Sequence, residues 1–168
     1  MPLTLYEASV PVFTQSLTAL GTVLGKADAQ AAALKFDAAV LLQARLYPNM
    51  FPLTRQIQIA ADFAKNAPAR LAGREPPALA DTEASFDELG ARIERTLEFL
   101  ATLTAADING QEQRLIDIKV GGQPRSFRGQ QYLLHYALPN FYFHASTAYA
   151  ILRHNGIDLG KKDFLGGA

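Results

Sequence analysis

Hydrophobic residues recur at helical spacing along four long stretches of the chain. In residues 4–24 the apolar positions alternate in steps of four and three, and in residues 52–72 they form a single stripe. Residues 85–104 repeat this pattern, with charged side chains on the opposite face. Residues 139–155 are apolar almost all round, which is typical of a buried helix. The pattern therefore predicts an all-α fold, a four-helix bundle in which these stretches bury one another's apolar faces.

Residues that start or stop helices flank these stretches. The capping-box spacing, a Ser or Thr followed three positions later by Glu, begins at Thr4 and again at Ser85. Pro139 suits the first turn of the last helix, and Gly156 suits the left-handed residue just past its end. Pro11 lies inside the first stretch, so we expect a kink or an irregular first turn there.

Short helical turns are expected where the chain connects the first and second long helices. Asp28 and Asp37 can each cap a short helix, the first reaching about Lys35 and the second about Leu46. Each is too short to be stable without tertiary packing. We therefore expect a crossover connection that carries two separate short helices.

The hydrophobic period changes to two between the third and fourth helices. Residues 113–120 alternate apolar and charged side chains, Gly121 and Gly122 offer a tight turn, and residues 124–127 can return as a second strand. This predicts a small β-hairpin lying against the bundle. We expect one domain over residues 1–168, with the tail, residues 157–168, docked or partly disordered.

Composition narrows the classes of function. The chain has 168 residues, 49% of them hydrophobic, and its 16 basic residues balance its 16 acidic ones without any basic stripe. A nucleic-acid or membrane-surface partner is therefore not expected. The absence of cysteine excludes thiolate catalysis and cysteine-ligated metals. No apolar run approaches the length of a membrane span and no basic signal sequence precedes Lys26, so we expect a cytoplasmic protein.

The fourth helix carries the candidate chemistry. Asn140 and His144 lie one turn apart on one face of an otherwise apolar helix. Two histidines at this spacing would indicate a metal site, but an amide oxygen is a weaker ligand for zinc-like ions. His144 is either a hydrogen-bonded core residue that holds two helices in register or a binding or catalytic group. The sequence leaves both alternatives open.

Three further residues complete the candidate pocket. Asp62 and Gln58 lie beside the apolar stripe of the second helix, where either a pocket or a solvated face fits their polarity. Tyr142, next to the polar face of the fourth helix, lines a pocket or belongs to the core. No catalytic residue can be assigned by this pattern.

Several segments, spread over most of the chain, resemble a bacterial protein family of unknown function. They are LPNFYFHASTAYAILRHNG at 138–156, GKKDFLG at 160–166, and ARLYPNMFPLTRQIQIAADFAKNAPARLAG at 44–73. That family is grouped with the DinB-like and YfiT-like four-helix bundles. The resemblance implies a DinB-like bundle with a long crossover and often a homodimer. Better-known members hold a divalent metal with three histidines, one on the second helix and an H-x-x-x-H pair on the fourth.

The resemblance also sets the expectations for function. Only His144 matches the metal-binding pattern, at the second histidine of the pair. Asn140 takes the first position, and Gln58 and Asp62 are the nearest polar candidates on the second helix. We therefore expect a small-ligand-binding or interaction module with a degenerate metal site and no cofactor. The alternative is a metal-dependent small-molecule hydrolase or transferase that uses His144 as its ligand or general base.

Overall fold

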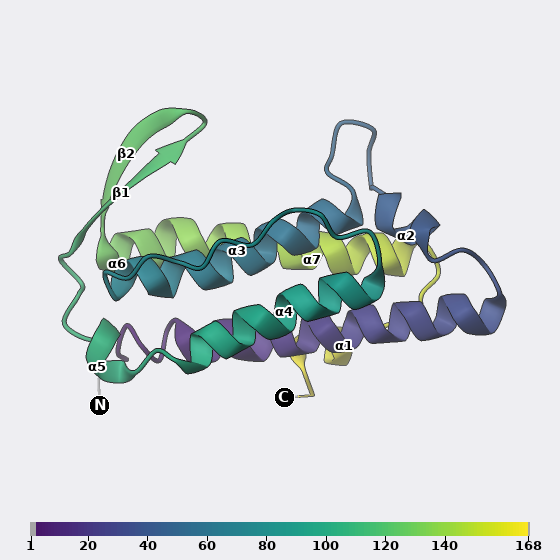
Figure 1. The fold of residues 1–168 in the computed structure, drawn as a ribbon, viewed down its shortest axis with the longest axis horizontal. Coiled ribbons are helices and arrows are strands. Elements are labelled where there is room, and N and C mark those ends of the chain that lie inside the picture. Colours follow the sequence, from purple (N-terminus) through teal and green to yellow (C-terminus); the bar gives the residue numbers. More distant parts are fainter. Residues whose placement is uncertain (1–2, 168) are drawn as a thin grey trace.

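The protein forms a four-helix bundle in a computed structural model that describes residues 3–167 (Figure 1). Its long helices are α1 (Val10–Leu34), α3 (Leu53–Leu71), α4 (Phe86–Ala101) and α7 (Leu138–His154). Helix α3 packs mainly on α7, α1 packs mainly on α4, and contacts between α3 and α4 join the two pairs. The predicted bundle is confirmed.

The core is built from the apolar stripes that the sequence displays. Phe13 of α1 and Phe141 of α7 are fully buried and pack edge to face, with ring centroids 5.1 Å apart. The other large side chains in the fully buried core include Leu17, Leu24, Leu53, Ile57, Leu71, Leu89, Ile93 and Leu100. Each long helix therefore owes its stability to the burial of one face rather than to propensity alone.

Helix α1 differs from its prediction at both ends. It begins at Val10, so Pro11 lies in the first turn, where the missing N–H costs no hydrogen bond. Of the two expectations for Pro11, the kink is wrong, whereas the turns over residues 5–9 give the irregular start. The Thr4 amide and the Glu7 carboxylate do bond to each other, at 3.0 Å, but they close a turn that precedes the helix. At the other end α1 continues to Leu34, because Ala27 and Ala31 stay in the core. The separate short helix after Asp28 is therefore absent.

A short helix, α2 (Ala39–Gln43), precedes α3. Helices α3 and α4 then run in the same direction, so the chain must travel back along the bundle between them (Figure 1). Residues 73–85 make this return as an extended segment lying along α3, which we call the crossover loop. Ser85 caps α4 by accepting a hydrogen bond from the Glu88 amide at 3.1 Å, as predicted.

The predicted hairpin is present after a short helix, α5 (Ala105–Ile108). Strands β1 (Leu115–Val120) and β2 (Gln123–Arg128) are antiparallel, with Ile116 opposite Phe127. Gly121 and Gly122 have φ angles of 57° and 80°, the left-handed values that a two-residue hairpin turn requires. The hairpin projects from one end of the bundle (Figure 1).

The hairpin leads directly into the last long helix. Helix α6 (Gly129–Tyr132) and a π-helical turn, η1 (Leu133–Ala137), continue without a break into α7. After α7 the chain turns back, and α8 (Lys161–Leu165) lies on α1. A 2.6 Å ion pair between Lys26 and Asp163 holds α8 there. Ala168, the last residue of the tail, lies outside the described residues. No helix in residues 3–167 is long and apolar enough to cross a membrane.

Candidate functional site

His144 faces α3 from the middle of α7, where it bonds to Gln56. The His144 Nδ1 and Gln56 Oε1 atoms are 2.7 Å apart, and the two residues are only 9% and 1% exposed. The Gln56 Nε2 atom donates to the Phe51 carbonyl at 3.1 Å. Because a carbonyl only accepts, this bond turns the amide oxygen of Gln56 toward the imidazole. His144 therefore carries its proton on Nδ1 and keeps a lone pair on Nε2.

The lone pair on His144 Nε2 is within reach of water. Within residues 3–167, Arg92 Nε is the only side-chain nitrogen or oxygen that is fully buried without a hydrogen bond. His144 Nε2 also makes no hydrogen bond, so it is not fully buried and solvent can reach it. The imidazole is stacked against the Phe63 ring, with centroids 6.3 Å apart. Burial, and secondarily the positive charge of Arg55, lower the pKa of His144 below its ordinary value of 6.5. The imidazole is therefore kept neutral at pH 7.

The other two candidates on α7 are engaged elsewhere. The Asn140 side-chain amide donates to the Tyr136 carbonyl at 2.7 Å, satisfying a backbone group where the π-helical turn joins α7. Tyr142 is 39% exposed and contacts the Phe141 ring. Neither side chain hydrogen-bonds to His144, although Asn140 is only one turn away.

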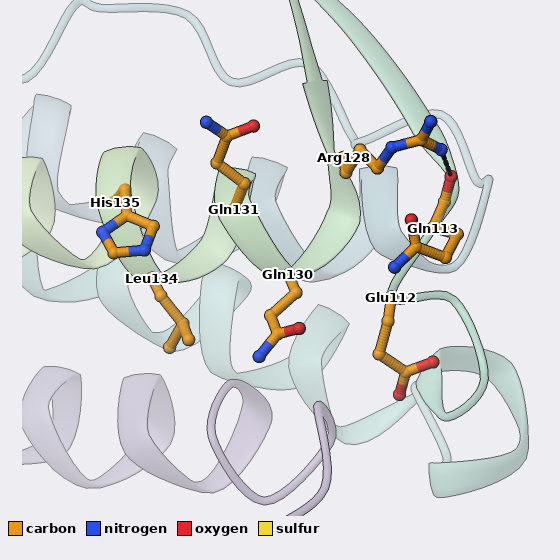
Figure 2. A pocket seen from close by; sticks show the side chains of 7 residues that line it. All are labelled: Glu112, Gln113, Arg128, Gln130, Gln131, Leu134 and His135. Carbon is orange, nitrogen blue, oxygen red and sulfur yellow. Dashed lines mark hydrogen bonds between the residues drawn. The ribbon is translucent and has the colours of Figure 1, made fainter.

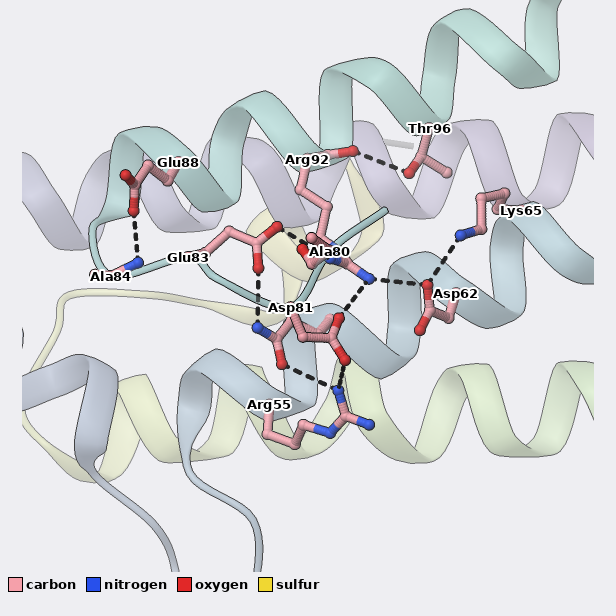
Figure 3. Close-up of polar contacts among 11 residues, drawn as sticks. Arg55, Asp62, Lys65, Ala80, Asp81, Glu83, Ala84, Glu88, Arg92 and Thr96 are labelled. Carbon is pink, nitrogen blue, oxygen red and sulfur yellow. Dashed lines mark hydrogen bonds and ion pairs between the residues drawn. The ribbon is translucent and has the colours of Figure 1, made fainter. Parts of the chain in front are cut away.

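Asp62 and Gln58 belong to a different cluster, on the side of α3 that faces α4 and the crossover loop (Figure 3). Asp62 accepts from Arg92 at 2.9 Å and from Lys65 at 3.2 Å. Gln58 donates to Glu83 at 2.9 Å. The structure thus brings Asp62 and Gln58 together with Arg92 rather than with His144.

Arg92 is the centre of this cluster, and none of its surface is exposed. Its guanidinium bonds to Glu83 at 3.0 Å and pairs with Asp81 at 3.0 Å, besides its bond to Asp62. Arg55 closes the network by pairing with Asp81 from the far side (Figure 3). The cluster joins α3, the crossover loop and α4. We call it the Arg92 network.

The charges of the Arg92 network balance. Its three cations are Arg55, Lys65 and Arg92, and its three carboxylates are Asp62, Asp81 and Glu83. Burial would raise the pKa of Glu83, but hydrogen bonds from Gln58 and Arg92 and the charge of Arg92 lower it below 4.5. Burial likewise opposes the charged form of Arg92, yet the carboxylates around it raise its pKa. Both groups therefore stay ionised.

A cleft of about 740 Å³ runs along α3 beneath the hairpin, and we call it the α3 cleft. Phe63, the ring stacked on His144, forms part of its wall. Three cationic side chains also line the cleft, Arg55 and Arg70 from α3 and Lys119 from β1. The remaining lining residues are Phe51, Ile59, Asp62, Asn66, Ile118, Gly121 and Tyr136. His144 thus lies directly behind one wall of the cleft.

A second hollow, of about 500 Å³, lies between the segment before β1 and helix α6 (Figure 2). Its polar side chains, which include Glu112 and His135, point in different directions (Figure 2). The one side-chain hydrogen bond among the residues drawn joins Arg128 to the Gln113 carbonyl at 3.3 Å. This hollow therefore offers no convergent set of groups.

Comparison with known proteins places the chain in a family. Residues 5–165 match the family described as a domain of unknown function, DUF1993. The chain belongs to this family. A crystal structure of a DinB family member from Shewanella denitrificans superposes with a TM-score of 0.89 and 40% identity, covering 98% of this chain and 93% of that one. No curated protein matches the chain. This DUF1993 domain is thus grouped with the DinB-like bundles, as the sequence indicated.

The donor set of this DUF1993 domain does not fit the metal that DinB-like bundles imply. No group of three His, Cys, Asp or Glu side chains within residues 3–167 could hold a metal ion. His144 offers one nitrogen lone pair, while Gln56 Oε1 accepts the imidazole proton and the Asn140 amide is bonded to the backbone. Zinc-like ions need three or four well-placed donors.

Two site residues of this DUF1993 domain were not singled out from the sequence, although a signal for each was present. Gln56 lies three residues after Leu53 and four before Ala60, within the apolar stripe of α3. Arg92 likewise falls among the buried positions of α4. A polar residue on a buried stripe must find a partner, so both positions could have been marked as sites of buried hydrogen bonding.

Proposed function

We propose that this protein is a small-molecule-binding module whose ligand is an organic anion with an aromatic or apolar body. The observation that supports this function best is the α3 cleft, whose lining includes the cations Arg70 and Lys119 and the rings of Phe63 and Tyr136. Its volume of about 740 Å³ falls within the usual range of small-molecule sites. Cations beside aromatic rings suit a ligand that is charged at one end and apolar at the other.

The charge of the cleft favours an anion. Among residues 3–167, Asp62 is the only carboxylate that lines it, and Lys65 and Arg92 already neutralise Asp62 from outside the cleft. Arg70 and Lys119 have no carboxylate within 4 Å in the described part of the chain. The cleft therefore carries positive charge that its own side chains do not cancel.

The bonded pair of His144 and Gln56 has a positioning role in this proposal. It ties α7 to α3 directly behind Phe63, the wall on which the apolar part of the ligand would rest. One neutral imidazole, hydrogen-bonded through Nδ1, supports a binding function better than metal-dependent hydrolysis or transfer. The ligand-binding residues are then Arg70, Lys119, Phe63 and Tyr136.

A matched pair of probes tests the proposal. Anilinonaphthalene sulfonate has an aromatic body and one negative charge, and N-phenyl-1-naphthylamine has the same body without the charge. Fluorescence titration of both at fixed ionic strength should show saturable binding of the sulfonate and weaker binding of the amine. The Lys119→Gln/Asn66→Glu variant should bind the sulfonate about fivefold more weakly, as expected for the loss of about 1 kcal/mol of charge interaction.

The control variant is Arg95→Glu, because it changes the net charge by the same two units on the exposed face of α4. It should bind both probes as the wild type does. Equal affinity of the wild type for the two probes would contradict the proposal. So would equal weakening of sulfonate binding in the control and the cleft variant.

A further inference from the structure

Three arginines line another cleft, separate from the hollow beside α6, where the C-terminal end of α3 meets the start of β1. Its volume is about 330 Å³. Arg70 lies in the last turn of α3, Arg74 follows the helix on the crossover loop, and Arg114 immediately precedes β1. We call this the arginine cleft. It shares Arg70 with the α3 cleft, whereas Arg74 and Arg114 line the arginine cleft only.

Neutral groups hold two of these guanidinium groups in place. Arg70 Nη1 donates to the hydroxyl of the buried Tyr132 at 2.8 Å. Arg74 Nη1 donates to the Thr102 carbonyl at 3.3 Å, and its guanidinium lies over the Phe99 ring, 5.7 Å from the centroid. Contacts of this kind orient a guanidinium without cancelling its charge.

The third guanidinium is placed by a close approach to the backbone. Arg114 Nε donates to Gln111 Oε1 at 2.9 Å. Its Nη1 lies so near Gly73 that a Cβ atom at that position would be only 2.7 Å away. Gly73 also has a φ of 66°, a left-handed value that glycine adopts without strain. The absence of a side chain at position 73 thus leaves room for the Arg114 guanidinium.

The charges of the arginine cleft are not balanced. In residues 3–167 none of its arginines has a carboxylate within 4 Å. Glu75 and Asp117 also line the cleft, so three positive groups face two negative ones. Asp117 accepts a hydrogen bond from Ser126 on the opposite strand. The end of α3 adds only about half a negative charge, and Asp107, near Arg74, is held by Thr104.

We propose that the arginine cleft binds a tetrahedral oxyanion of the phosphate class, either free phosphate or the terminal phosphate of a small ester. Guanidinium groups present paired N–H donors that match the oxygens of phosphate. Each arginine here keeps donors that no group in the described part of the chain accepts. An oxyanion would place acceptor oxygens where Arg70, Arg74 and Arg114 have donors but no carboxylate within 4 Å. The volume of the cleft suits a phosphate and a small attached group.

Thermal unfolding in sodium phosphate, compared with sodium chloride of equal ionic strength, tests the site. A ligand bound only by the folded protein raises Tm with its concentration. Phosphate should therefore raise the Tm of the wild type more than chloride does. Titration calorimetry with phosphate should give a dissociation constant at least about tenfold higher for Arg74→Gln/Arg114→Gln than for the wild type, because the variant loses two charge-assisted partners.

Two further variants separate a built site from general charge. Arg95→Glu changes the net charge by the same two units and should respond to phosphate as the wild type does. Gly73→Ala keeps every charge but displaces the Arg114 guanidinium, so its dissociation constant for phosphate should rise. A wild-type Tm that responds equally to phosphate and chloride would overturn the proposal. An unchanged dissociation constant in Arg74→Gln/Arg114→Gln would do the same.

A second titration identifies the source of the phosphate group. Tighter binding of phenyl phosphate than of inorganic phosphate would assign the site to a small phosphate ester, and tighter binding of inorganic phosphate would assign it to the free anion. The arginine-cleft variants leave Lys119 and Asn66 intact. Failure at this site is therefore distinguishable from failure of the α3 cleft to bind an organic anion.

Discussion

Replacing Arg92 with Met should destabilise the protein more than any other single change in the Arg92 network. Methionine keeps much of the apolar stem of arginine but removes its charge. Glu83, which is 4% exposed, would then be a buried carboxylate without its cation. The Ala80 carbonyl, which accepts from Arg92 at 3.1 Å, would also lose its donor.

The magnitude follows from these contacts. Removing one partner of a buried ion pair typically costs about 3–5 kcal/mol, because the other charge stays buried and uncompensated. Asp62 and Asp81 are partly exposed and retain Lys65 and Arg55 as partners, so they add little. We expect a loss of about 3 kcal/mol, which for a urea m-value of about 2 kcal/mol/M lowers the unfolding midpoint by about 1.5 M.

Urea unfolding followed by circular dichroism at 25 °C provides the measurement. Arg95→Met, on the exposed face of the same helix, is the matched control and should change the stability by less than about 0.5 kcal/mol. The Arg92→Met/Glu83→Gln variant should recover part of the loss, because it removes the buried charge together with its partner.

The pH dependence gives a second readout. The folded-state pKa of Glu83 lies below its unfolded value of about 4.5, so its contribution is complete above pH 4.5 and is lost as the pH falls through the folded-state pKa. In Arg92→Met, burial without a cation should raise the pKa of Glu83, and the carboxyl should protonate earlier. The difference between wild type and variant should therefore shrink from pH 7 to pH 4.5. A loss below about 1 kcal/mol, or a difference independent of pH, would refute this account of the network.

Three other predictions concern the histidine, the glycines and the assembly. His144→Ala should lose about 1–3 kcal/mol by urea unfolding whether or not zinc is present, because a buried amide loses its partner. Wild-type stability should also fall below pH 6.5, because the unfolded chain then takes up a proton that the buried imidazole of His144 resists. A Tm that rises with zinc in the wild type but not in His144→Ala would contradict a packing role. Gly129→Ala should be strongly destabilising, since its Cβ would lie 2.2 Å from the Gln111 carbonyl oxygen, whereas Gly90→Ala, in open space on α4, should raise Tm by the equivalent of about 0.5–1 kcal/mol. Light scattering at micromolar concentration should give twice the 18.3 kDa chain mass, as expected for a homodimer. The monomer mass would dismiss that expectation.

The sequence by itself determined the elements that local chemistry specifies. Apolar residues at helical spacing identified the four long helices, and the capping residue Ser85 and the glycine pair at 121 and 122 marked a helix start and a hairpin turn. Each of these features depends on residues within a few positions of one another. The predicted end of the first helix at residue 24 is wrong for the complementary reason. Ala27 and Ala31 are helical because the folded core buries them, and no local signal specifies that burial.

Only the tertiary structure decided which polar groups meet. Gln56 and His144 are 88 positions apart, and Asp62 and Arg92 are 30 apart, so no periodicity links either pair. The sequence grouped Asp62 and Gln58 with His144 because both lie beside the apolar stripe of the second helix, where the family resemblance expects a metal ligand. The rotation of α3 about its axis instead turns Gln56 toward α7 and turns Asp62 and Gln58 toward α4 and the crossover loop. Such rotations are fixed by the packing of the whole core, and a one-dimensional pattern does not contain them.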